Sequence, residues 1–227
     1  MFNAQKLKIC IALITLGVAS YTPQVMSFGL GDMLGGGSKT SNASAGDPDA
    51  FLKSAKDAES LMNNSVTLLV RSLASKEKAA GFEASRKAAN AVTDPAEKQA
   101  KLNEVSKSEA ATINEILSND KFKDDIKQMD GKQKEDLGAA AFNFALALLQ
   151  DQSLVEQSSG LISSLLSNPM NVSKLGTVKD AAFSLSNQVS SASKIAAKMP
   201  DVFSAVGVKA PASKDEKPKT TSQVAGD

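Results

Sequence analysis

The segment Gly138–Leu149 reads GAAAFNFALALL and carries no charged side chain. A helix on the surface of a bundle keeps one polar face, whereas a helix without a polar face has to be covered by neighbouring elements on every side. The uncharged run is also shorter than the ~20 residues that a membrane-spanning helix needs. The sequence therefore predicts a helix that is buried at the centre of a bundle.

Two Asp-Pro pairs mark helix starts, because aspartate caps the first turn and proline is favoured at the first helical position. Apolar residues recur at helical spacing from Phe51 to Leu73 after Asp47-Pro48, and as far as Leu117 after Asp94-Pro95. No stretch shows the sustained alternation that is typical of a strand. We therefore predict an all-α fold, a compact multi-helix bundle.

The remaining helices are bounded by local signals of the same kind. Ser153-Leu154-Val155-Glu156 has the pattern of a capping box, which predicts a separate helix start inside the apolar C-terminal half. Pro200 predicts the end of the last long helix, because a proline inside a helix removes a backbone hydrogen bond. Further helices are thus expected over 76–91, 121–129, 132–150, 153–168 and 177–198, with a short final turn over 200–207.

The N-terminus has the pattern of an export signal. Lys6 and Lys8 precede an apolar run, Ile9–Ala19, which has the length of a signal-peptide core. Small residues offer cleavage points after Ser20 and after Ser27, and we favour the second. We therefore predict a signal peptide over residues 1–27 and an exported protein, periplasmic or extracellular.

Three further regions follow the signal. Residues 28–46 form a Gly/Ser-rich leader whose glycines disfavour regular structure. Residues 47–209 form a single helical-bundle domain of ordinary size. Residues 210–227 are rich in lysine, proline, serine and threonine, which predicts a disordered, solvated tail.

The composition argues against several classes of function. The chain has no histidine, which is the commonest general base and metal ligand, and its one cysteine, Cys10, lies within the predicted signal. The 26 basic and 25 acidic residues are balanced and form no basic cluster, so we expect no nucleic-acid partner. We accordingly predict that the protein is not an enzyme and that it uses no cofactor and no metal.

Short motifs that suggest chemistry are weak here. Gly35–Thr40 reads GGGSKT, but Ser38 stands where a phosphate-binding loop needs glycine directly before the lysine, so we expect no nucleotide. Ser75–Lys78 and Ser191–Lys194 match the Ser-x-x-Lys spacing of penicillin-recognising enzymes, without the companion Lys-Thr-Gly strand. The acidic cluster of residues 120–136 is interleaved with lysines, which favours a solvated surface over a calcium loop.

The leader supplies the candidate functional residues. Phe28, Leu30, Met33 and Leu34 are large apolar side chains spaced by glycines, and such residues on an exposed segment lower solubility unless something covers them. They either dock on another protein or a lipid surface, or fold back on their own bundle. We name them as a possible docking segment.

Three classes of function remain open on these grounds. We expect an exported non-catalytic helical protein with a structural or protein-interaction role in the cell envelope or outside the cell. Its partner would be another envelope protein or a lipid surface. The alternatives are a lipid- or membrane-binding helical bundle, and an enzyme that works without histidine and cysteine.

Overall fold

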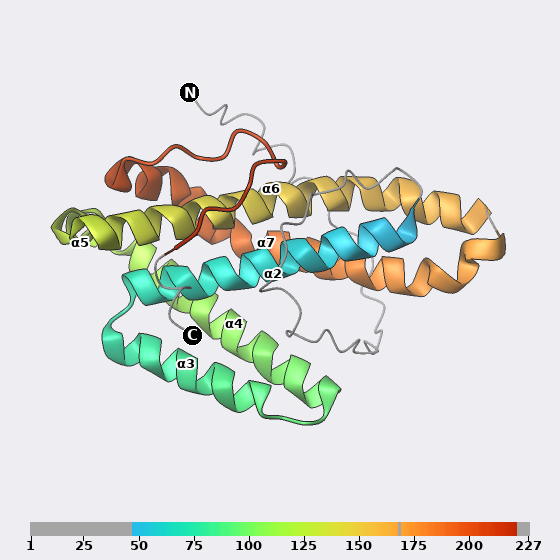
Figure 1. The fold of residues 1–227 in the computed structure, drawn as a ribbon, viewed down its shortest axis with the longest axis horizontal. Helices are drawn as coiled ribbons and strands as arrows, with labels where there is room; N and C mark the ends of the chain where they lie inside the picture. Colours follow the sequence, from blue (N-terminus) through green and yellow to red (C-terminus); the bar gives the residue numbers. More distant parts are fainter. Residues whose placement is uncertain (1–46, 168, 222–227) are drawn as a thin grey trace.

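A computed structural model describes residues 47–167 and 169–221, and within these ranges the regular structure is entirely helical. Three long helices lie side by side along the molecule, and shorter helices pack around one end of them (Figure 1). The predicted all-α bundle is therefore confirmed. With the labels of Figure 1, its elements are α2 (Pro48–Leu73), α3 (Lys76–Asn90), α4 (Pro95–Ser118), α5 (Phe122–Gln128), α6 (Gly131–Ser167), the 3-10 helix η2 (Pro169–Lys174) and α7 (Leu175–Val206).

The helix starts at the Asp-Pro pairs are confirmed. The Asp47 carboxylate accepts hydrogen bonds from the backbone N–H groups of Asp49 and Ala50, and Asp94 accepts one from that of Glu97. In both helices the proline follows the cap directly, where its missing N–H has no intrahelical partner to lose. These local signals place the first turns of α2 and α4 correctly.

The predicted helix start at Ser153 is wrong, because α6 runs unbroken through it for 37 residues, about 55 Å. A capping side chain needs free backbone N–H groups, and inside a continuous helix those groups already bond to the preceding turn. Ser153 Oγ instead accepts a hydrogen bond from the Gln157 side chain, 2.9 Å away. The expected helices over 132–150 and 153–168 are therefore one.

The predicted break at Pro200 is also wrong, since α7 continues past it to Val206 and ends at Gly207, whose φ of 72° suits a glycine cap. The apolar stripe explains why. Ile195, Met199 and Val202 are all buried on the same side, so their packing maintains the helix across the proline.

The core is divided into two apolar clusters along the bundle. One lies where α4 and α5 join the long helices and includes Phe144 and Leu146 of α6. The other lies toward η2 and is built from α2, α6 and α7 alone, around Phe51 and Leu165. Within Gly138–Leu149 every residue is buried except Ala145 and Leu149, which are partly buried, and this confirms the central helix predicted from its uncharged sequence.

The chain after α7 takes a course that its composition did not suggest. We expected a solvated tail from residue 210 onward, and residues 210–221 indeed contain no helix or strand. They nevertheless lie along α6, where Pro211 and Thr221 are buried and Asn143 hydrogen-bonds to Lys219. This segment covers a side of α6 that the other helices leave free (Figure 1).

Candidate functional site

The predicted docking segment, Phe28, Leu30, Met33 and Leu34, lies outside the described residues, as do the signal region and the GGGSKT motif. The structure does fix the point where this part of the chain joins the bundle. Asp47 caps α2 at the end of the molecule where α6 turns into α7 (Figure 1). An ion pair between Asp49 and Lys174 ties the first turn of α2 to η2 there.

This end of the bundle, which we call the η2 end, carries exposed apolar side chains. Phe183 of α7 is 71% exposed, Leu166 of α6 is 61% exposed and Val172 of η2 is 46% exposed. They are the large hydrophobic residues that stand out as exposed in the described part of the chain. Single exposed apolar residues are ordinary, and these three lie on elements that contact one another, α6, η2 and α7.

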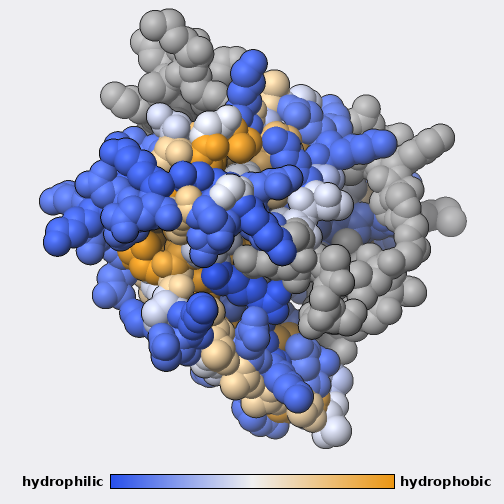
Figure 2. Space-filling view, turned by 60° about the vertical axis from the view of Figure 1, so that its left-hand side comes forward, coloured by the Kyte–Doolittle hydropathy of each residue, from blue (hydrophilic) through white to orange (hydrophobic). Residues whose placement is uncertain are grey.

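The opposite end of the bundle, around α5, carries many charged side chains. Figure 2 turns the α5 end toward the reader, and in that view hydrophilic residues cover much of the described surface, with hydrophobic patches between them. Lysine and aspartate side chains pair there, as Lys123 does with Asp201 at 2.8 Å and Lys127 with Asp124 at 2.8 Å. Within the acidic cluster, Asp124 thus forms a surface salt bridge of the kind that the interleaved lysines predicted, whereas Asp136 is buried in α6 and departs from that prediction.

A layer of polar side chains separates the two apolar clusters. Asp151 of α6 has no exposed surface, and one of its oxygens accepts a hydrogen bond of 2.8 Å from the Gln188 side chain of α7. Its other oxygen, Oδ1, is buried without a hydrogen-bond partner in the described structure. Glu59 of α2 is the further acidic group near enough to act on Asp151.

The environment of this layer changes its acid–base behaviour. Burial raises the pKa of Asp151 to about 8, the hydrogen bond from Gln188 opposes that rise, and the charge of Glu59 adds to it. Burial also raises the pKa of Glu59 above its usual range. The layer can therefore hold a proton near neutral pH, although the burial of Asp151 keeps it from direct contact with a substrate.

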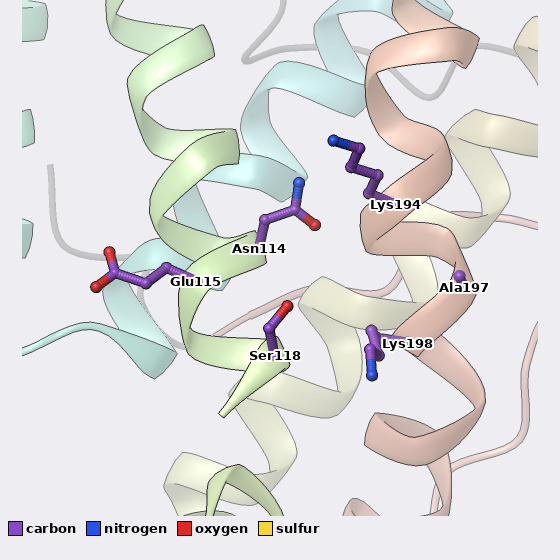
Figure 3. A pocket seen from close by; sticks show the side chains of 6 residues that line it. All are labelled: Asn114, Glu115, Ser118, Lys194, Ala197 and Lys198. Carbon is purple, nitrogen blue, oxygen red and sulfur yellow. The ribbon is translucent and has the colours of Figure 1, made fainter. Parts of the chain in front are cut away.

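A shallow cleft of about 460 Å³ lies between α4 and α7. Asn114 and Ser118 of α4 face Lys194 and Lys198 of α7 across it, while Glu115 points away from α7 (Figure 3). Its lining side chains offer amide, hydroxyl and ammonium groups, but no carboxylate faces the lysines as an acid–base partner. The cleft is open and polar, unlike the mostly apolar pockets that enclose small molecules.

No family model, no curated protein and no solved structure matches this chain. The function therefore has to be inferred from the residues of the chain itself.

The Ser-x-x-Lys motifs occupy ordinary helical positions. Ser75 caps α3, and its hydroxyl accepts a hydrogen bond of 3.3 Å from the backbone N–H of Lys78. The Lys78 side chain turns instead to Glu115, 3.7 Å away. Ser191 and Lys194 are both exposed on α7. In the described residues, neither serine hydroxyl is hydrogen-bonded to the lysine amine that would have to activate it.

Two kinds of site are absent from the described residues, 47–167 and 169–221. No cluster of three or more Asp, Glu, Cys or His side chains is arranged to hold a metal ion there. None of the helices in these ranges has the length and apolar character of a membrane span.

The polar layer was not predicted from the sequence, although a signal for it was present. Asp151 follows Leu148 by three positions and precedes Leu154 by three, so it lies on the apolar stripe of its helix. Glu59 directly follows the buried Ala58, and Gln188 follows the buried Leu185 by three positions, about one helical turn. A polar residue at a core position is a more informative observation than an exposed one.

Proposed function

We propose that this chain is an exported, non-catalytic helical protein that acts by binding another protein, in the cell envelope or outside the cell. Support comes first from the residue types, because the chain has no histidine and its cysteine lies in the segment expected to be cleaved. The most strongly perturbed carboxyl group in the described structure, Asp151, is sealed inside the bundle. These features favour a role in recognition over a role in covalent chemistry.

The observation that carries the proposal is the exposure of three large apolar side chains, Leu166, Val172 and Phe183, on α6, η2 and α7. Phe183 is 71% exposed, and burying a phenylalanine side chain contributes roughly 1.5–3 kcal/mol. Aromatic side chains of this kind are enriched in protein interfaces. The leader with Phe28 and Leu34 joins the same end of the bundle through Asp47, so leader and bundle can contact one partner together.

The test compares the mature full chain with a variant that lacks residues 28–34 and with Phe183→Ala. Ser184→Ala is the matched control, because Ser184 is the exposed neighbour of Phe183 on the same helix. Cross-linking in a detergent-free envelope extract of the source cells should yield an adduct with one protein. Both test variants should lose the adduct with unchanged melting curves, and Ser184→Ala should keep it.

Other outcomes would contradict the proposal. Flotation with vesicles of mixed anionic and zwitterionic lipid, lost on deletion of residues 28–34, would show a lipid-binding bundle instead. A lower melting temperature on that deletion would show that the leader packs on its own bundle. N-terminal sequencing of the exported chain tests the signal peptide, with Phe28 expected as the first residue.

A further inference from the structure

The segment Val208–Thr221, which we call the C-terminal strap, leaves α7 at Gly207 and runs along α6. It turns over residues 213–216 and then returns across α6 (Figure 1). Its side chains and backbone contact α6 at successive positions of that helix, from Gly138 to Gln150. The strap thus occupies a defined surface of α6.

Asn143 holds the strap by its backbone. The Asn143 side chain donates a hydrogen bond of 2.8 Å to the Lys219 carbonyl oxygen and accepts one of 2.7 Å from the Lys219 backbone N–H. Gln150 donates a third bond, 3.0 Å long, to the carbonyl oxygen of Lys214. Because these bonds join backbone groups of the strap, they recognise an extended chain with little regard to its side chains at those positions.

Specific side-chain contacts accompany the backbone bonds. A Cβ atom added to Gly138 would lie 2.7 Å from a methyl group of Val208, so the glycine allows the strap to approach α6 closely. The Lys219 ammonium lies 4.3 Å from the centre of the Phe142 ring, within the range of a cation–π contact. Pro211 and Thr221 are buried as well.

The strap also holds its own shape at the turn. The Glu216 carboxylate accepts hydrogen bonds from the backbone N–H groups of Ala212 and Ser213. The Ser213 hydroxyl accepts a hydrogen bond of 3.2 Å from the backbone N–H of Asp215. A peptide that is ordered in part before it binds loses less conformational entropy on binding.

The surface under the strap needs an occupant. Asn143 is only 5% exposed, and a buried amide without partners costs about 1–3 kcal/mol. Simple release of the strap is therefore disfavoured, whereas exchange for another extended peptide keeps the Asn143 bonds. We propose that this face of α6 is a peptide-binding site, filled in the resting protein by its own strap. In the complex it takes an extended segment of a partner protein that places a lysine over Phe142.

This inference deepens the protein-interaction role, and it rests on that role only for the existence of a partner. Its test uses a synthetic peptide and does not involve the leader or Phe183. A recognition sequence for a site-specific protease is inserted after Lys209 in the full mature chain, and the folded protein is cut there. The probe is a fluorescent peptide of residues 210–221, and its anisotropy is measured with cut and uncut protein.

The peptide should bind the cut protein and should bind the uncut protein far more weakly, because the tethered strap competes at a high effective concentration. Asn143→Ala should weaken binding to the cut protein about 30-fold, as expected for two lost hydrogen bonds. Gln150→Ala, which removes one bond, should weaken it about fivefold. Asn187→Ala, at an exposed position of α7, is the matched control and should leave binding unchanged.

The peptide itself supplies a second comparison. A peptide with Lys219→Pro lacks the N–H that Asn143 bonds, whereas Lys219→Ala keeps it and loses only the contact with Phe142. The proline peptide should therefore bind more weakly than the alanine peptide. Three results would overturn the proposal. The cut protein could unfold, the peptide could fail to bind it, or the peptide could bind the Asn143→Ala and Asn187→Ala variants equally well.

Discussion

The buried carboxyl group of Asp151 predicts how the free energy of unfolding depends on pH. Its pKa is raised from an ordinary 3.8 to about 8 in the folded protein, chiefly by burial. Between those pH values the folded state holds one proton more than the unfolded state, so the free energy of unfolding falls as pH rises. For one proton the slope is at most about 1.4 kcal/mol per pH unit.

The perturbation is Asp151→Asn. Asparagine has the shape of the neutral acid and can still accept the hydrogen bond from Gln188, but it does not titrate. From pH 5 to pH 7 the wild-type protein should lose up to about 3 kcal/mol relative to the variant. The variant should therefore be the more stable protein at pH 7, and the difference should shrink toward pH 4.

The assay is urea unfolding followed by circular dichroism at pH 4, 5, 6 and 7, with stability taken from linear extrapolation. Glu156→Gln is the control, since it removes an exposed acid from the same helix. Glu59 also has a raised pKa and contributes a slope of the same sign, so a smaller decline should persist in Asp151→Asn. A variant that declines as steeply as the wild type, or a wild type whose stability rises over this range, would refute the reasoning.

Other predictions concern the core, the strap and the chemistry of the mature chain. Leu146→Ala should lower the free energy of unfolding by about 2–5 kcal/mol, while Leu166→Ala, on the same helix but 61% exposed, should change it little in denaturant titrations. Gly138→Ala should increase proteolysis of the strap, because its Cβ meets Val208, and adding Val208→Ala should reverse that increase. Reductant and chelator should leave the melting temperature of the mature chain unchanged in calorimetry, and a shift of several degrees with chelator would reveal a metal site.

The sequence predicts what is decided within a few residues. Asp47 and Asp94 cap helices because each carboxylate bonds to backbone groups two or three positions later. Gly207 ends α7 by its own backbone conformation. The fold class and most helix ends follow from such signals.

The sequence fails where a distant contact overrides a local signal. Ser153 has the pattern of a helix start and Pro200 that of a helix end, yet both lie inside long helices whose apolar stripes are packed on other elements. Asn143 is an apparent exception in an apolar run, and its partner Lys219 lies 76 positions further along the chain. Contacts between residues so far apart do not appear in the local periodicity of the sequence, so the position of the strap could not be predicted from it.

The hairpin of α3 and α4 has a consequence for how the molecule opens. Ala89 is the buried residue of α3. An ion pair joins Arg86 of α3 to Glu109 of α4, and the Glu109 side chain is fully buried. Lys78 of α3 pairs with Glu115 of α4 as well, and Phe82 is only partly buried against the core. A helix held largely by ion pairs, with little apolar area beneath it, unfolds locally at a lower free energy than the core. Backbone amides of α3 should therefore exchange with deuterium well before those of α6, and removing Arg86 alone should accelerate exchange in α3 while that of α6 stays slow.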